Sequence, residues 1–253
     1  MKNRSELTIL GVIPARLNST RLPGKVLRPI CGQPMLHHVF AGASRSAMLD
    51  ALVVATDSQE VYEYCARSQM KVLMTSSRHL SGTDRIHEVM GTMPADVYVN
   101  IQGDEPMIRP EHLSILLQPF LEDASVQVTT LKTPIGLEEA HNPNCVKVVT
   151  AKDGKALYFS RCAVPYDREQ SRGLRYFKHL GMYAYTRSAL DRFHQLSPSR
   201  LEQAEKLEQL RFLEHGIPIH VAETSHDTIG VDTEDDLIRV ERYFQHCDPS
   251  DRP

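Results

Sequence analysis

Residues 8–25 read TILGVIPARLNSTRLPGK and join a short apolar run to a polar loop that carries three cations. The run Thr8–Ile13 is rich in β-branched residues, which predicts a buried strand. Short apolar runs then alternate with amphipathic stretches as far as about residue 150. This alternation predicts an α/β fold with a mostly parallel central sheet, because helices are the usual crossovers between parallel strands.

The pattern gives definite boundaries for the expected elements. Strands are expected at Thr8–Ile13, Ala51–Ala55, Val72–Met74, Val97–Ile101, Val126–Leu131 and Val146–Thr150, and helices at Met35–Ser44, Gln59–Ser68, Asp84–Met90 and Glu111–Leu121. In the second half, Asp153-Gly154 predicts a hairpin, residues 166–175 an exposed loop or arm, and 178–186 another strand. Residues 200–215 predict one amphipathic helix, ended by Gly216. We expect one domain over residues 1–253, with an elaborated second half.

Composition excludes several classes of protein. The chain has 253 residues, of which 41% are hydrophobic and 24% charged, and its formal net charge is −3. These values are ordinary for a globular enzyme and offer no basic field for nucleic acid or an anionic membrane. No apolar run approaches the ~20 residues that span a bilayer, and the N-terminus lacks a signal-peptide pattern. Five scattered cysteines argue against zinc or a disulfide framework and favour a reducing cytoplasm.

The loop after the first strand has the composition of an anion site. Arg16, Arg21 and Lys25 lie in one short loop, where they would repel one another unless an anion lay among them. Ligands of open α/β sheets bind at the carboxyl ends of strands, which is where this loop begins. Ser19 and Thr20 add hydroxyl donors. The loop therefore predicts a triphosphate site, with a solvated basic turn as the alternative; it matches neither the Gly-x-Gly-x-x-Gly nor the Walker pattern.

Two aspartates are candidate metal ligands. In VYVNIQGDEP, residues 97–106, the expected strand runs into Asp104 and Glu105, an acidic pair at the same sheet edge as the cationic loop. The hard carboxylate of Asp104 suits Mg²⁺ bound together with substrate phosphates. Asp232 follows another short apolar run in TIGVDTEDDL. Taken alone, this second aspartate fits a helix N-cap better, a role that Asp232 or Thr233 could fill. Asp57, which ends a strand in VVATDS, is interpreted as structural.

Seven motifs in order resemble the 3-deoxy-manno-octulosonate cytidylyltransferases, also called CMP-Kdo synthetases. The resemblance covers about residues 9–242 and rests on IPARLNSTRLPGK (13–25), SGTDR (81–85), NIQGDEP (100–106), ALYFSR (156–161), KHLGMYAY (178–185), LEQLR (207–211) and GVDT (230–233). It implies the nucleotide-diphosphosugar-transferase fold, which is Rossmann-like, with Mg²⁺ as cofactor and usually a homodimer. It also implies transfer of CMP from CTP to the sugar acid Kdo, with release of pyrophosphate, for lipopolysaccharide precursors. Residues 1–150 would then be the nucleotide-binding half and 151–253 the sugar-binding and dimerisation half.

The resemblance also implies roles for individual residues. Arg16 and Lys25 would hold CTP phosphates, and Asp104 and Asp232 would ligate Mg²⁺. On the nucleotide side they would be joined by Ser19, Thr20, Arg21, Ser81 and Gly82. The sugar pocket would be formed by Arg85, Gln102, Arg161, His179, Tyr183, Glu208 and Gln209. Without the resemblance, His179 would be interpreted as a hydrogen-bonded core histidine, and Glu208 with Arg211 as a pair on one helix face.

Three alternatives stay open at this stage. The acceptor could be an 8-amino analogue of Kdo, since some relatives with MTS and KHLGVYAYTR runs act on that sugar. It could also be a nine-carbon sialic-acid-like sugar, although QGDEP and LEQLR look less like that branch. The third is a non-catalytic nucleotide-binding protein, a class that typically loses its metal carboxylates.

One position departs from the family pattern. Ser76 stands where many family members have Arg, and Arg78 is a candidate to replace that arginine.

Overall fold

The computed structural model describes residues 7–17, 22–79, 81–169 and 173–247, which form two compact units. Chain divisions after Ser114 and Asp227 separate them. The N-terminal unit contains the described residues up to 114 together with 228–247, and the middle unit contains residues from 115 to 227. Within the described residues, no helix is both long and apolar enough to cross a membrane.

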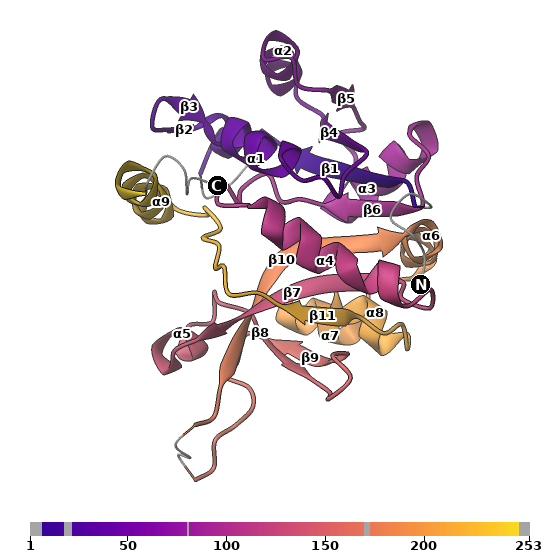
Figure 1. The fold of residues 1–253 in the computed structure, drawn as a ribbon, viewed down its shortest axis with the longest axis vertical. Helices are drawn as coiled ribbons and strands as arrows, with labels where there is room; N and C mark the ends of the chain where they lie inside the picture. Colours follow the sequence, from indigo (N-terminus) through magenta and orange to yellow (C-terminus); the bar gives the residue numbers. More distant parts are fainter. Residues whose placement is uncertain (1–6, 18–21, 80, 170–172, 248–253) are drawn as a thin grey trace. The chain divides into compact units, whose positions relative to one another are not determined.

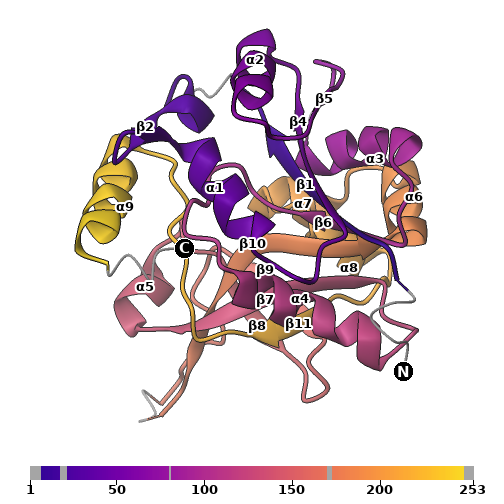
Figure 2. The ribbon, with the colours of Figure 1, turned by 45° about the horizontal axis from the view of Figure 1, so that its top comes forward.

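The N-terminal unit is built on a parallel sheet (Figure 1). Its elements are β1 (Ile9–Ala15), η2 (Lys25–Leu27), β2 (Pro29–Ile30), β3 (Gln33–Pro34), α1 (Met35–Ser44), β4 (Ala51–Thr56), α2 (Gln59–Arg67), β5 (Val72–Met74), α3 (Gly82–Thr92), β6 (Val97–Asn100) and α9 (Glu234–His246). The strands lie in the order β6-β1-β4-β5, and every pair is parallel. Helix α2 lies against β4 and β5 at one edge (Figure 2).

The strand order of this sheet reverses between β1 and β6. The chain moves from β1 outward through β4 to β5, and then returns through α3 to place β6 on the other side of β1. The two strands are parallel, and the register pairs Val12 with Asn100, so their carboxyl ends lie at the same edge of the sheet. In open α/β sheets, ligands bind outside the carboxyl ends of the strands at such a reversal. The residues that follow β1 and β6 therefore lie where a site is expected.

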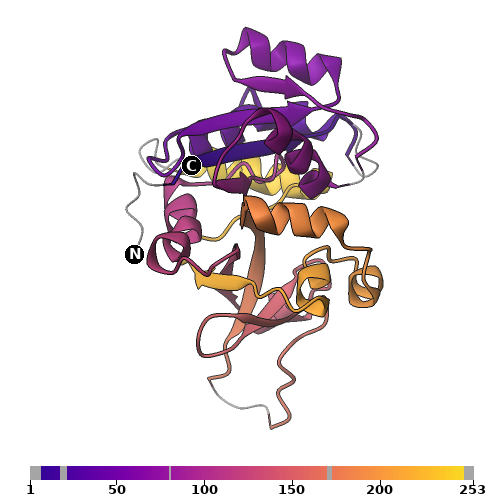
Figure 3. The ribbon, with the colours of Figure 1, turned by 90° about the vertical axis from the view of Figure 1, so that its right-hand side faces the viewer.

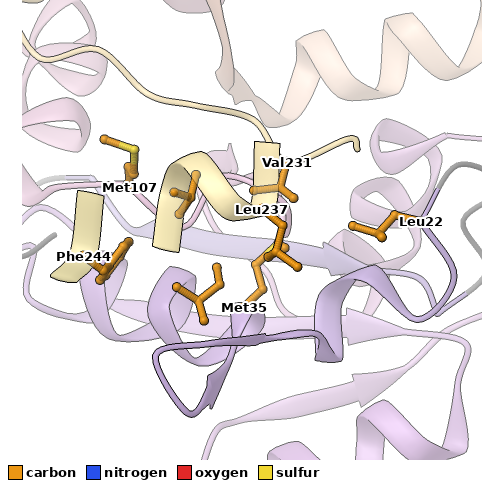
Figure 4. Packing of buried hydrophobic residues seen from close by; sticks show 8 residues of the cluster. Leu22, Met35, Met107, Val231, Leu237 and Phe244 are labelled. Carbon is orange, nitrogen blue, oxygen red and sulfur yellow. The ribbon is translucent and has the colours of Figure 1, made fainter. Parts of the chain in front are cut away.

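The C-terminal helix α9 belongs to the N-terminal unit. Its buried residues Leu237, Val240 and Phe244 form one apolar cluster with Met35 of α1 and Leu22 (Figure 4). Burial of such side chains is worth about 1.5–3 kcal/mol each. This packing brings the segment just before α9, which contains Asp232, back to residues more than two hundred positions earlier in the chain.

The middle unit has a mixed sheet. Its elements are β7 (Val128–Ile135), α5 (Leu137–His141), β8 (Lys147–Thr150), β9 (Ala156–Ser160), β10 (Tyr176–Thr186), α6 (Arg187–Gln195), α7 (Arg200–Glu205), α8 (Leu210–Glu214) and β11 (His220–Glu223), while α4 (Pro110–Glu122) spans the division. Strand β10 is antiparallel to β7 and β8, and β11 is parallel to β7. The described residues between β9 and β10 form a loop that extends away from these strands, and Tyr166 in it is 86% exposed (Figure 3).

These elements confirm most of the expected fold. The α/β class with a mostly parallel sheet is confirmed, and so is the hairpin at Asp153-Gly154, which joins the antiparallel strands β8 and β9. The single helix expected over 200–215 is wrong. The chain breaks at Lys206, which takes a left-handed conformation (φ 54°), and the turn that follows buries Leu207 and Gln209 before α8 begins. The division into a nucleotide half and a sugar half stays a prediction.

Candidate active site

The loop after β1 is closed by a glycine and returns a lysine to the sheet edge. Arg16 directly follows β1, and Gly24 donates its backbone N–H to the carbonyl of Leu17 at 3.2 Å. Gly24 has φ +66°, a conformation that side chains with a Cβ rarely adopt. Lys25 then begins η2 with its side chain mostly buried. The predicted phosphate ligands Ser19, Thr20 and Arg21 lie outside the described residues.

The turn after β6 packs closely against the end of β1, where this loop begins. A Cβ on Gly103 would lie 2.9 Å from the backbone oxygen of Pro14, so only glycine fits there without a shift of the backbone. The backbone carbonyl of the next residue, Asp104, accepts a hydrogen bond from the backbone N–H of Val231 at 2.9 Å. Glu105 is buried and accepts the hydroxyl of Thr228 at 3.3 Å. Glu105 and the Asp104 carbonyl therefore both hold the returning C-terminal segment in place.

Thr233, and not Asp232, is the N-cap of α9. Its hydroxyl accepts the N–H of Asp236, and the Asp236 carboxylate accepts the N–H of Thr233 in return. This capping box leaves the carboxylate of Asp232 outside the helix start. The sequence left the cap between two neighbours, and the structure assigns it to the threonine.

Lys25 lies between the two candidate metal ligands. Its Nζ is 2.6 Å from Asp104 Oδ2 and 3.0 Å from Asp232 Oδ1. Burial of the ammonium group opposes its charge, but the two carboxylates outweigh that effect and raise the pKa of Lys25. Three of the side chains predicted for phosphate and metal binding in this unit, Lys25, Asp104 and Asp232, therefore converge on one point.

The donor set at this point fits a hard divalent cation. Two carboxylates face the ammonium group of Lys25. Among the described residues no cluster of three or more His, Cys, Asp or Glu side chains gathers to hold a metal. An ion here would take two protein carboxylates and complete its shell with water and phosphate oxygens, as Mg²⁺ prefers.

The start of α3 lies beside the end of β1. Ser81 is its N-cap and exchanges hydrogen bonds with Asp84, whose backbone N–H lies 3.1 Å from the serine hydroxyl. A Cβ on Gly82 would lie 3.5 Å from the ring of Pro14, the penultimate residue of β1. Ser81 and Gly82 are thus close to the β1 edge, as a nucleotide contact requires, while the serine hydroxyl is already used as a cap.

Arg85 lies in an interior ion pair. Its guanidinium is fully buried, donates to Asp57 Oδ2 at 2.9 Å and also bonds the hydroxyl of Thr75. The predicted contact of Arg85 with a sugar would need this pair to open. Asp57, interpreted from the sequence as structural, is the partner. Gln102, also predicted for the sugar, is half-buried just after β6.

In the middle unit, Arg161 is held by main-chain carbonyls. Its Nε donates to the carbonyl of Glu205 at 2.8 Å and its Nη1 to that of Pro143 at 3.0 Å. Its own backbone N–H donates to the Glu205 carboxylate, and its carbonyl accepts from Lys147 Nζ at 2.7 Å. None of the described residues bonds the end of the guanidinium that carries the second Nη1 hydrogen and Nη2.

His179 and Tyr183 lie on one face of β10. Nε2 of His179 is 3.0 Å from Thr130 Oγ1, and its ring meets Phe159 edge-on at 5.0 Å and Tyr183 at 5.3 Å. Burial, with a smaller contribution from Lys178, lowers the pKa of His179 to about 3, so the ring is neutral. Tyr183 stacks on Tyr185 at 5.6 Å.

Three predicted sugar ligands carry buried polar atoms without a hydrogen bond. Among the described residues these atoms are Nε2 of Gln209 and the hydroxyl of Tyr183, together with Nε of Arg85 and Oδ1 of Asn100. Burial raises the pKa of the Tyr183 hydroxyl well above its usual value, and the nearby Thr130 side chain opposes this only in part. The Tyr183 hydroxyl nevertheless forms no hydrogen bond of ordinary geometry with the described residues. Glu208 is half-buried in the turn before Gln209. A buried polar atom without a protein partner is suited to a ligand.

Sequence reasoning missed the residues that support these side chains. Lys147 is fully buried, and its ammonium donates to the carbonyls of Asn142, Cys145 and Arg161. Glu205 accepts from the Ser160 hydroxyl and the Arg161 N–H. Lys147 opens an apolar strand, where a fully buried lysine is unusual, so its position was a usable signal. Glu205 on a polar helix gave none.

Comparison with known proteins gives matches over most of the chain. A family model described as cytidylyltransferase matches residues 10–223. The 3-deoxy-manno-octulosonate cytidylyltransferase of Koribacter versatilis is 59% identical over 236 residues, which cover 93% of this chain and 90% of the relative. The protein of the same description from Acidobacterium capsulatum is 56% identical, with 94% and 97% covered.

Solved structures agree with these relatives. The structure of CMP:2-keto-3-deoxy-manno-octonic acid synthetase complexed with CTP matches with a TM-score of 0.90 and 45% identity, over 94% of this chain and 98% of the other. A putative glucose-1-phosphate thymidylyltransferase from Bacillus anthracis, 14% identical with a TM-score of 0.65 over 95% and 97% of the two chains, shows the fold alone. The chain therefore belongs to the 3-deoxy-manno-octulosonate cytidylyltransferase family.

Proposed function

We propose that this protein transfers CMP from CTP to 3-deoxy-manno-octulosonate, forming CMP-Kdo and pyrophosphate. The observation that carries the proposal is the convergence of Lys25, Asp104 and Asp232 at the strand-order reversal of a cytidylyltransferase-family sheet. A non-catalytic relative would have no need to keep two carboxylates around one cation. Their retention therefore supports an enzyme.

The N-terminal unit would hold the nucleotide and the metal. Asp104 and Asp232 would ligate Mg²⁺, and Arg16 and Lys25 would bind the phosphates. Ser19, Thr20, Arg21, Ser81 and Gly82 are proposed as further nucleotide contacts. When bound, Mg²⁺ would neutralise charge on the phosphate oxygens and help to orient them. Lys25 would then exchange part of its contact with the carboxylates for contact with phosphate.

The middle unit would hold the sugar acid. The free end of the Arg161 guanidinium suits the carboxylate, and the neutral groups of His179, Tyr183 and Gln209 suit hydroxyls. Glu208 would add an acceptor. Within this unit, Arg161 is the cation proposed for the sugar and the other groups are neutral or acidic, which matches a substrate with one carboxylate and many hydroxyls. The predicted sugar contacts of Gln102 and Arg85 stay proposals.

The proposed reaction requires no covalent bond to the protein. The anomeric hydroxyl of the sugar attacks the α-phosphorus of CTP, the new P–O bond forms as the bond to pyrophosphate breaks, and the hydroxyl proton is released. Arg16 and Lys25 would stabilise the charge that develops on the phosphate oxygens, and positioning would supply the rest of the rate enhancement. We further propose a cytoplasmic homodimer that supplies lipopolysaccharide precursors.

Pyrophosphate release tests the proposal. The purified protein is incubated with CTP and Mg²⁺ and with Kdo, 8-amino-Kdo or a sialic acid in turn, with Asp104→Asn as the control variant. Release that depends on Kdo and disappears in the variant is expected. Release with only one of the other sugars would reassign the acceptor. CTP binding without release in any mixture would show a non-catalytic relative and overturn the proposal.

A further inference from the structure

Thr130 of β7 lies under the bend in β10 next to His179. The pairing of β10 with β7 shifts between Leu180 and Tyr183, so Gly181 and Met182 form a bulge. The Thr130 side chain is fully buried, and its hydroxyl points at this bulge: Oγ1 lies 2.7 Å from the carbonyl of Met182 and 3.2 Å from that of Leu180. The same oxygen is 3.0 Å from Nε2 of His179.

The single hydroxyl proton decides which nitrogen of His179 is protonated. Both bulge oxygens are carbonyls and can only accept, so the hydroxyl proton is directed to them, most directly to Met182 at 2.7 Å. The hydroxyl oxygen then has a lone pair for Nε2, which must carry a hydrogen to use it. The opposite tautomer would draw the hydroxyl proton toward Nε2 and away from both carbonyls. The arrangement therefore favours Nε2–H with Nδ1 bare.

The rest of the surroundings keeps the ring in place and uncharged. Phe159 meets it edge-on and Tyr183 lies against it, so the ring cannot turn without displacing an aromatic neighbour. The pKa of the ring lies near 3, so it carries no second proton at neutral pH. Nδ1 makes no hydrogen bond to the described residues and is not among their buried atoms without a partner, so it reaches solvent.

We infer that Thr130 is a positioning residue, which holds His179 in the Nε2–H tautomer and leaves Nδ1 as a neutral acceptor for a substrate hydroxyl. The second half of this inference rests on the proposed sugar-binding function of His179; the first half does not. An uncharged acceptor nitrogen accepts a hydrogen bond from a hydroxyl group. It does not attract a carboxylate, which has no hydrogen to donate. His179 would thus bind a hydroxyl of the sugar, while Arg161 would bind its carboxylate.

Nitrogen NMR measures the tautomer directly. The protein is labelled with ¹⁵N-histidine, and the two-bond proton–nitrogen correlations are recorded near neutral pH, with His179→Gln used to identify the His179 signals. The wild type and Thr130→Ser, which keeps the hydroxyl, are expected to show the Nε2–H pattern. Thr130→Val, which keeps the shape and removes the hydroxyl, is expected to show mixed tautomers. A wild-type Nδ1–H pattern, or an unchanged pattern in Thr130→Val, overturns the inference.

Kinetics test the second half with the same variants. Thr130→Val is expected to raise the KM for the sugar acid about 10-fold, as the loss of one oriented hydrogen bond does, and to leave the KM for CTP unchanged. Thr130→Ser is expected to restore it. An NMR change with no change in sugar KM would remove His179 from sugar recognition while the tautomer assignment stands. If Thr130→Val fails to fold, the wild-type pattern still decides the first half, and the sugar KM of Thr130→Ser beside that of His179→Gln decides the second.

Discussion

The two units bring polar groups together by opposite means. In the N-terminal unit, two carboxylates and an ammonium group meet within 3.0 Å, and their charges hold them together. In the middle unit, the residues proposed for the sugar are mostly neutral, lie among aromatic rings and depend on backbone carbonyls for their orientation. Charged clusters act through the number and spacing of charges, whereas neutral pockets act through the direction of each hydrogen bond. Substitutions should therefore affect the two units differently.

The largest effect is expected from removing a charge at the carboxylate pair. Asp104→Asn keeps the shape but gives up the anionic ligand that Mg²⁺ prefers, so turnover should fall at least about 1,000-fold with the fold intact. Asp232→Asn should behave similarly. Pyrophosphate release gives the rate, and titration with Mn²⁺ followed by electron paramagnetic resonance gives the metal affinity. Near-normal rates in either variant would remove that aspartate from the metal site.

Loss of a cation in the same unit should cost somewhat less. Arg16→Ala and Lys25→Ala are each expected to lower kcat/KM by about 2–4 kcal/mol of transition-state stabilisation. Lys25→Ala also removes the ammonium group that lies between Asp104 and Asp232. Equilibrium titration should show weaker CTP binding and unchanged sugar binding. Equal losses for both ligands would contradict a role at the phosphates.

In the middle unit, direction should matter more than charge. Arg161→Lys keeps the positive charge but cannot donate to the Glu205 and Pro143 carbonyls and a carboxylate at once, because lysine lacks the planar fork. We expect the sugar KM to rise about 10-fold or more and the CTP KM to stay the same. Initial rates against each substrate at saturating levels of the other provide the test. A change confined to CTP would place Arg161 on the nucleotide side.

The neutral state of His179 should appear in the pH dependence of stability. Its pKa of about 3 in the folded protein lies below the ~6.5 of an unfolded histidine, so the unfolded chain binds a proton first as the pH falls. The free energy of unfolding should therefore decrease from about pH 6.5 down toward pH 3. His179→Gln should remove about 1–2 kcal/mol of the loss seen between pH 7 and pH 5. Urea unfolding of both proteins at the two pH values checks it; parallel curves would show a normally titrating ring.

The smallest effect should come from the helix cap next to Asp232. Thr233→Ala removes the hydroxyl that accepts the Asp236 N–H and should cost about 1 kcal/mol of stability. Turnover should stay close to the wild-type value, because the carboxylate of Asp232 is not part of the cap. Thermal unfolding and pyrophosphate release are measured together. A rate as low as that of Asp232→Asn would mean that the cap positions the carboxylate.

The difference between the units also explains what sequence could reveal. Hydrophobic periodicity located the strands and helices of the N-terminal unit closely, including α1 at Met35–Ser44, because each is covered locally. Charged residues in the loops after two apolar runs gave Lys25 and Asp104, since the edge of a parallel sheet gathers such loops, whereas Asp232 became a candidate metal ligand only through the family resemblance. Neither signal could show that the Thr233 side chain, and not that of Asp232, would cap α9.

The supporting network of the middle unit had no such signal. Thr130 looks like an ordinary strand residue, and its importance comes from a bulge in a strand about fifty positions away. The break at Lys206 was hidden in a sequence of good helix formers, because it is imposed by the burial of Leu207 and Gln209. Long-range packing decides these features, and periodicity within one element does not report it.

The C-terminal segment returns to the N-terminal unit, where the backbone N–H of Val231 donates to the carbonyl of Asp104, and this return has a consequence for synthesis of the chain. Lys25 and Asp232, which face each other in the folded protein, are 207 positions apart, so a ribosome exposes the lysine long before its second carboxylate partner. A nascent or prematurely terminated chain has neither the complete carboxylate pair nor the helix that covers Met35. Products truncated before Asp232 should therefore be inactive and poorly protected from proteolysis.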